Sequence, residues 1–258
     1  MLRPRLIPCL LIHKGGLYKT KEFGQPKYVG DPLNAVRIFN EKEVDELIVV
    51  DIDASRLRCE PDYKLIAKLA SECRMPLSYG GGVQTLEAVD RIITLGVEKV
   101  AISSAAVKNP ELVTQAAKRV GSQSVIGVID VKKTGLFRRY EVVTNNASER
   151  TGLEPASWAA ELQSLGAGEI LLNSVDADGE MQGYDYDLVD KVRAEVSTPL
   201  TVLGGAGSLE HFQSLFSRYG IIGAAAGSFF VFKGKYRAVL ISYPNRNEKN
   251  GLYDNKGV

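Results

Sequence analysis

Residues 76–82 read Pro-Leu-Ser-Tyr-Gly-Gly-Gly, and residues 199–205, 123 positions further along, read Pro-Leu-Thr-Val-Leu-Gly-Gly. Three other pairs of segments repeat in the same order at nearly the same spacing: 46–53 with 169–176, 101–107 with 225–231, and 7–14 with 126–133. Chance similarity between apolar strands explains one such match but not four in order, so the pattern indicates an internal duplication. The sequence predicts two halves built on one plan, at about 1–120 and 121–241.

Short apolar runs alternate with amphipathic stretches through both halves. The apolar runs are consecutive, which is typical of strands covered on both faces. We expect strands at 5–12, 47–52, 76–79, 99–102, 124–129, 169–172, 199–203 and 221–226, and helices at 32–44, 62–73, 86–95, 110–120, 155–165, 186–196 and 209–218. Eight strands alternating with helices predict an α/β fold, a (β/α)8 TIM barrel occupying 1–241 as one domain. We do not expect the polar tail, 242–258, to be ordered.

The composition excludes several classes of protein. A formal net charge of +1 argues against a strongly basic nucleic-acid binder. No run approaches 18 apolar residues and no signal peptide is recognisable, so we expect a cytoplasmic protein with no membrane span. Cys9, Cys59 and Cys73 lack metal-binding spacing, and His13 and His211 have no companion ligands, so we expect neither metal nor cofactor.

Two matched sets of small residues follow barrel strands, at the end where barrels bind ligands. Glycines let the backbone approach a ligand closely, and the N–H groups at a following helix start favour an anion. The sets are Gly81 and Gly82 with Ser103 and Ser104, and Gly204 and Gly205 with Gly227 and Ser228. They predict a small molecule with a phosphate at each end; ordinary turn glycines are the alternative.

Carboxylates are also expected at this end of the barrel. Asp130 ends the fifth apolar run and is therefore a candidate general acid or base. A helix cap or a solvated loop residue suits Asp178 better than Asp130. The repeat aligns Asp130 with Leu11, so a twofold site built on paired carboxylates lacks its second acid here.

Four charged residues stand at the starts of strands, at the opposite end of the barrel: Arg5, Glu46, Lys99 and Glu169. Alternating charges in one ring could pair across the axis and close the bottom of the barrel. From the residues alone, ordinary stabilising ion pairs are the favoured interpretation and a gate is the alternative.

Up to about Lys235, the chain resembles the cyclase subunit of imidazole glycerol phosphate synthase. The matching stretches include Arg5-Leu-Ile-Pro-Cys-Leu10, Gly80-Gly-Gly82, Ile129-Asp130, Asp176-Ala-Asp-Gly179 and Gly204-Gly-Ala-Gly207. The resemblance implies a glutaminase subunit docked at the N-terminal barrel face, and ammonia that passes the four-residue ring and crosses the interior. It also implies a doubly phosphorylated substrate at the mouth, where two aspartates act as general acid and base. Beyond the two small-residue sets, it assigns ligand binding to Lys19, Asp176, Asp178 and Gly179.

The chain departs from the family pattern where the chemistry takes place. Leu11 occupies the position of the family's first catalytic aspartate, which leaves Asp130 alone. Ser103, Leu203 and Glu180 also replace family residues around the two phosphate sites, and a carboxylate at 180 would repel a phosphate nearby.

This profile is similar to the cyclase-like paralogues of bacterial O-antigen and surface-polysaccharide pathways. The resemblance implies a barrel that conducts ammonia within a glutamine-dependent amidotransferase, with reduced or absent cyclase activity, and that hands it to a third protein, a sugar amidotransferase. Two alternatives stay open: an authentic cyclase of histidine biosynthesis, and a non-catalytic barrel that binds a phosphorylated ligand.

Overall fold

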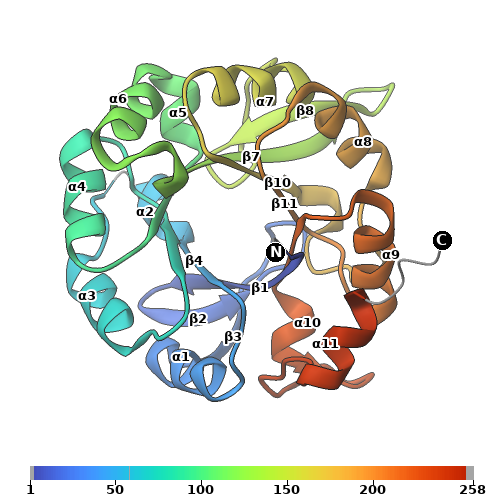
Figure 1. Cartoon of the computed structure of the whole chain (residues 1–258). Coiled ribbons are helices and arrows are strands. Elements are labelled where there is room, and N and C mark those ends of the chain that lie inside the picture. Colours follow the sequence, from blue (N-terminus) through green and yellow to red (C-terminus); the bar gives the residue numbers. More distant parts are fainter. Residues whose placement is uncertain (1–2, 58, 254–258) are drawn as a thin grey trace.

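The computed structural model describes residues 3–57 and 59–253 of the chain. Eight parallel strands follow one another in chain order, and β7 pairs with β10 as well as with β6, so the sheet closes. Figure 1 shows the strands at the centre and helices around them. The barrel strands are β1 (Arg5–His13), β4 (Leu47–Asp51), β5 (Leu77–Gly80), β6 (Lys99–Ile102), β7 (Val125–Thr134), β10 (Glu169–Ser174), β11 (Leu200–Leu203) and β12 (Gly223–Ala226). The predicted (β/α)8 TIM barrel is therefore confirmed.

Seven outer helices lie where the amphipathic stretches predict them. They are α1 (Pro32–Glu41), α3 (Tyr63–Glu72), α4 (Leu86–Thr94), α6 (Glu111–Val120), α7 (Pro155–Ser164), α8 (Tyr186–Glu195) and α9 (Leu209–Tyr219). Side chains cap several of their first turns; Asp31, for example, accepts a hydrogen bond from the Asn34 backbone N–H while Pro32 opens α1. Their apolar faces bury residues such as Phe39 and Phe212 against the sheet.

Shorter elements decorate the connections, and the sequence pattern did not reveal them. They are β2 (Gly16–Lys19), β3 (Lys27–Gly30), α2 (Ile52–Leu57), α5 (Ser104–Lys108), β8 (Arg139–Thr144), β9 (Glu149–Arg150), α10 (Ser228–Val231), β13 (Phe232–Lys233), β14 (Ala238–Val239) and the 3-10 turns η1 (Ser122–Ser124) and η2 (Val175–Ala177). Apart from η1, they follow the carboxyl ends of barrel strands, so this face carries most of the added elements. Among the described helices, none combines the length and apolar character that a bilayer crossing requires.

The tail was expected to be disordered, and the structure corrects this for residues 246–253, which form α11 (Arg246–Tyr253). Leu252 of this helix is buried, and Lys249 Nζ lies 2.5 Å from Asp45 Oδ1. Just before α11, the Tyr243 hydroxyl donates to the Leu6 carbonyl at 3.0 Å. These contacts supply the anchoring that the polar composition did not reveal; residues 254–258 lie outside the described part.

The barrel interior follows from the two-residue period of strands, since alternate side chains point inward. Ile7 and Cys9 of β1 face inward, and Leu11 continues the same series. Together with Ile48, Ala101, Ile126, Leu171 and Ala225, Ile7 and Cys9 form an apolar layer separate from the core under the helices. This layer separates the charged bottom of the barrel from the polar mouth.

Candidate functional site

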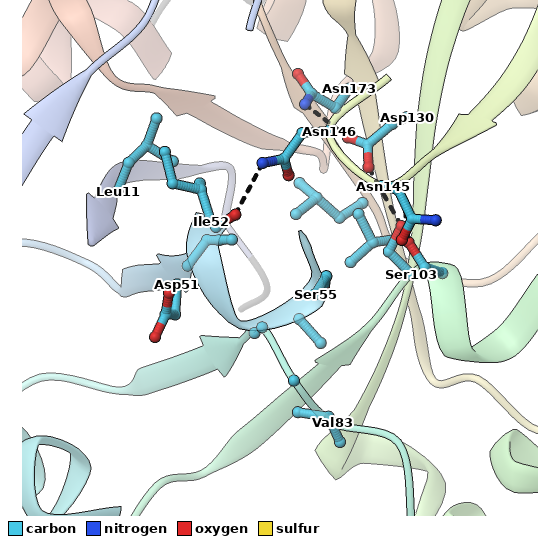
Figure 2. A pocket seen from close by; sticks show the side chains of 18 of the residues that line it. Leu11, Asp51, Ile52, Ser55, Val83, Ser103, Asp130, Asn145, Asn146 and Asn173 are labelled. Atoms are coloured by element: carbon cyan, nitrogen blue, oxygen red, sulfur yellow. Dashed lines mark hydrogen bonds between the residues drawn. The ribbon is translucent and has the colours of Figure 1, made fainter. Parts of the chain in front are cut away.

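A cavity of about 460 Å³ opens at the carboxyl ends of the barrel strands. Its wall includes Leu11, Lys19, Asp51, Asp130 and Asn173. Figure 2 shows Leu11 on one side and Asp130, with Asn173 and Ser103, on the other. The cavity lies where barrels of this kind bind their ligands.

Asp130 ends the inward-facing series of Ile126 and Val128 on β7 and so reaches the cavity. The Asn173 amide donates to its Oδ1 at 2.8 Å, and the Ser103 hydroxyl donates to its Oδ2 at 3.2 Å. Burial raises the pKa of Asp130 to about 6, although both hydrogen bonds act in the opposite direction. A carboxyl group with this pKa can exchange a proton near neutral pH.

Leu11 brings no acid to the opposite wall. It packs, half-buried, against the interior apolar layer, as do Val50, Val128 and Leu203. Leucine cannot donate or accept a proton, so this wall offers only apolar contact. The surroundings of Asp130 are therefore polar on one side and hydrocarbon on the other.

Two further carboxylates of the cavity wall are already engaged. Asp178 accepts a hydrogen bond from the Thr20 hydroxyl at 2.7 Å, and Asp51 accepts from the backbone N–H of Asp53 at 2.9 Å. Burial raises the pKa of both groups. Neither side chain projects free into the cavity as a substitute for the missing partner.

Lys19 is buried beneath the mouth and donates to the carbonyl of Cys9. Burial lowers the pKa of its ammonium group. Gly227 leaves the room that Lys19 fills, because a Cβ there would lie 2.5 Å from Lys19 Nζ. Lys19 therefore stands next to both Asp178 and the second small-residue set.

The first small-residue set lines the cavity: Gly81, Gly82, Ser103 and Ser104. Gly81 adopts φ +108°, and a Cβ there would lie 2.3 Å from the Asp51 carbonyl oxygen, so only glycine fits. Ser104 begins α5, and its hydroxyl accepts from the Asn145 backbone N–H at 3.1 Å. The structure thus brings these four residues together on one side of the mouth.

The second set surrounds a separate, much smaller pocket of about 10 Å³. Its wall is formed by Asp178, Gly179, Gly204, Gly205, Ala206, Leu203, Ala226, Gly227 and Ser228. The Arg237 guanidinium donates to the Ser228 hydroxyl at 3.2 Å. A pocket of this size holds about one water molecule, so a phosphate would need the surrounding loops to open.

Glu180 and Asp176 both have protein partners near the mouth. Glu180 pairs with Lys21 at 2.8 Å, which partly neutralises the expected repulsion of a phosphate. Asp176 accepts from the Lys133 backbone N–H at 2.7 Å and fastens the extension of β7 rather than lining the cavity.

Sequence reasoning missed three amide side chains at the mouth. Asn173 is the register partner of Asp130 between β10 and β7, which explains their contact. Asn145 and Asn146 line the cavity from the β8–β9 turn, and Asn146 donates to the Ile52 carbonyl at 2.8 Å (Figure 2). The consecutive asparagines are a turn signal, and the polar end of the 169–172 run was the available signal for Asn173.

A closed ion-pair ring occupies the opposite end of the barrel. Arg5 lies 2.5 Å from Glu46 and 2.7 Å from Glu169, and Lys99 lies 2.8 Å and 2.9 Å from the same two residues. Ser78 and Thr201 donate further hydrogen bonds to Glu46 and Glu169.

The ring sets the ionisation of its members. Burial alone would raise the pKa of Glu169, but Arg5 and Lys99 lower it below its usual range. The two carboxylates in turn raise the pKa of Lys99, against the effect of burial. All four predicted residues meet in one charged plug.

Known proteins resemble this chain over nearly its whole length. The sequence profile of the family described as "Histidine biosynthesis protein" matches residues 5–237. A Leptospira interrogans protein named "Putative imidazole glycerol phosphate synthase subunit HisF" is 55% identical over 253 residues, 98% of this chain and 100% of that protein. A Vibrio vulnificus protein named as a subunit hisF3 is 55% identical, covering 96% of each chain. An Alkaliphilus metalliredigens protein named "Imidazole glycerol phosphate synthase subunit HisF" is 40% identical over 230 residues, 89% of this chain and 91% of that protein.

Proposed function

The chain belongs to the histidine biosynthesis protein family, among the cyclase subunits of imidazole glycerol phosphate synthase, and we propose that it serves as the ammonia-receiving subunit of a glutamine-dependent amidotransferase. In this proposal a glutaminase docks at the N-terminal barrel face. Ammonia then passes the ring and the interior layer and emerges in the mouth cavity.

The two ends of the barrel support this assignment through their contrast. The ring of Arg5, Glu46, Lys99 and Glu169 is complete, and the layer above it consists of apolar side chains. Such a layer favours neutral ammonia over ammonium, because burying an unpaired charge is costly. The ring is closed as it stands, so passage requires that one of its side chains swing away.

The proposal that cyclase activity is reduced or absent rests on Leu11, which stands where a second carboxyl group would be needed. A positioned acid or base contributes typically about 10²–10⁴ in rate, and hydrocarbon occupies the wall opposite Asp130. The ammonia is then used elsewhere. We propose transfer to an activated sugar of a surface-polysaccharide or O-antigen pathway, performed by a third protein.

An authentic cyclase of histidine biosynthesis is the second candidate, and the state of Asp130 favours it. A carboxyl group with a pKa of about 6, held by Asn173 and Ser103, can serve as base in one step and acid in another. In this alternative a doubly phosphorylated substrate spans the mouth between the two small-residue sets.

Two measurements on the purified protein separate these functions. With an ammonium salt and the histidine-pathway cyclase substrate, we expect turnover at least 100-fold below that of an authentic cyclase; rapid turnover would establish the alternative. With a purified glutaminase of the family, we expect a stable complex and increased glutamine hydrolysis. Lys99→Met, which opens the ring, is tested in the same way. If neither the wild type nor this variant forms a complex with the glutaminase, the barrel is a ligand-binding scaffold.

A further inference from the structure

Large apolar side chains are exposed almost entirely on one face of the molecule. Among the described residues they are Tyr28, Leu57, Leu136, Phe137, Ile221, Tyr236, Val239 and Leu240. All but Ile221 belong to segments that follow the carboxyl end of a barrel strand, on the side of the cavity, whereas Ile221 precedes β12. A concentration of this kind marks a site of interaction with another molecule.

The first exposed group lies in the turn of the β7–β8 hairpin. Leu136 is 92% exposed and Phe137 is 80% exposed, at the tip of a hairpin that reaches the periphery beside α8 in Figure 1. Residues 132–139, the first tip, carry four cations and no carboxylate: Lys132, Lys133, Arg138 and Arg139. Lys133 pairs with Asp185 at 2.9 Å, so the tip combines exposed apolar side chains with a net positive charge.

The second exposed group crowns the β13–β14 hairpin and repeats this construction. Tyr236 is 83% exposed within residues 233–238, the second tip, which carries Lys233, Lys235 and Arg237 and again no carboxylate. In both tips a left-handed glycine is followed three residues later by a left-handed arginine whose N–H donates to the glycine carbonyl: Arg138 to Gly135 at 3.2 Å and Arg237 to Gly234 at 3.0 Å. The sequences differ, but the turns and their chemistry match.

Each tip is connected to one of the two small-residue sets at the mouth. Arg237 of the second tip donates to Ser228. β8, which returns from the first tip, ends at Thr144, and the N–H of the next residue, Asn145, donates to Ser104. Both tips therefore extend from segments that reach the rim of the mouth.

We propose that the two tips are the docking surface for a partner protein that covers the barrel mouth with an acidic surface bearing apolar pockets. The inference rests on the proposed function, because ammonia released into an open mouth would be protonated and lost to water. A cover seated on both tips keeps the cavity dry while the ammonia crosses to the acceptor site. Aromatic and arginine side chains are the types that anchor such interfaces.

The distribution of charge favours a protein over a lipid surface. Exposed carboxylates also lie at the starts of outer helices on this face: Asp31 at α1, Glu154 at α7 and Asp187 at α8. A continuous anionic bilayer would meet these carboxylates, whereas a protein can place its acidic residues opposite the tips alone.

Site-specific photo-cross-linking in cells of the source organism tests the inference. A photoreactive amino acid is placed at Phe137, at Tyr236 or, as the control on the other face, at Ile221. We expect one and the same protein attached at Phe137 and Tyr236 and absent at Ile221. Cross-linking to lipid alone, to another copy of this chain, or to unrelated proteins at the two tips would overturn the proposal.

The identified protein is then purified, and its binding to the wild type and to the triple variant Leu136→Ser/Phe137→Ser/Tyr236→Ser is compared. We expect at least a tenfold weaker complex for the variant, and weaker binding at higher salt for the wild type. Glutaminase binding, at the opposite barrel end, must stay unchanged in the same variant. If the wild type fails to bind the glutaminase, the proposed function is wrong; if only the tip variant has no effect, this inference is wrong.

Discussion

Asn173 and Asp130 face each other across neighbouring strands, and the amide of Asn173 donates to Asp130 Oδ1 at 2.8 Å. This hydrogen bond favours the ionised carboxylate, so it opposes the effect of burial and holds the pKa of Asp130 at about 6. Asn173 is thus a positioning residue for Asp130.

Asn173→Ala should raise the pKa of Asp130 above about 6, because burial remains and the donor is lost. Ser103→Ala, which removes the longer hydrogen bond, should raise it less. A carboxyl carbon NMR titration of both variants measures the shifts, and an unchanged or lower pKa in Asn173→Ala would contradict this view.

Asp130→Asn should change the pH dependence of stability. A raised folded-state pKa means that the folded protein holds this proton more tightly, so the wild type loses stability as pH rises from about 4 through about 6. The variant has no such carboxyl group and does not lose this stability. Its free energy of unfolding relative to that of the wild type should therefore rise by up to about 2 kcal/mol between pH 4 and pH 8. Urea unfolding at the two pH values measures the difference.

Asp53→Asn provides a control of opposite sign. Burial would raise the pKa of Asp53, but hydrogen bonding from Lys14 and the nearby His13 lower it, so its stabilisation is present above the unfolded-state pKa and is lost in acid. Asp53→Asn should therefore cost more stability at pH 7 than at pH 3.

Leu11→Asp should restore a second carboxyl group opposite Asp130. If the missing acid or base limits ring closure, turnover of the cyclase substrate with ammonium should increase by about 10²–10⁴. Leu11→Asn introduces a side chain that is similar to aspartate in size and polarity but cannot transfer a proton, so it should give no such increase. Equal activity of the two variants would show that proton transfer at residue 11 is not the limiting feature.

Lys99→Met should both open and destabilise the ring. Glu46 and Glu169 would share Arg5 alone, and removing one partner from a buried ion-pair network costs about 3 kcal/mol. Ser78→Ala, which removes only a 3.1 Å hydrogen bond to Glu46, should cost about 1 kcal/mol. Chemical denaturation compares the two, and equal losses would mean that the ion pairs of Lys99 stabilise the fold no more than the single hydrogen bond of Ser78 does.

Gly205→Ala should be much more disruptive than Gly234→Ala, although both glycines adopt positive φ. A Cβ at Gly205 would lie 1.9 Å from the Gly183 carbonyl oxygen, whereas nothing lies within 4 Å of one at Gly234. We expect about 1 kcal/mol from conformational strain at Gly234 and a loss of several times that at Gly205. Thermal melting of the two variants separates steric exclusion from strain.

The repeat and the apolar runs predicted the barrel because both are strong periodic signals. The order of the eight strands and the meeting of Arg5, Glu46, Lys99 and Glu169 at one end follow from the strand starts alone. Element ends differed by a few residues; β7, for instance, continues to Thr134 because it pairs with β8 beyond the barrel.

The details of the mouth could not be predicted, because they depend on contacts between segments far apart in the chain. The hydrogen bonds from Thr20 to Asp178, from Asn146 to Ile52 and from Arg237 to Ser228 all come from loops without periodicity. The order of α11 has the same origin, since its anchor is Asp45, about 200 residues away in the sequence.

The closed ring also bears on how the two halves of this duplicated chain recognise each other. Arg5, Glu46 and Lys99 come from the first half, and Glu169 comes from the second. Separated at the boundary, the first half would hold an unbalanced positive charge and the second a lone buried anion. Association of the two halves restores neutrality. Two fragments produced as separate polypeptides are therefore attracted to each other by the opposite charges of the ring.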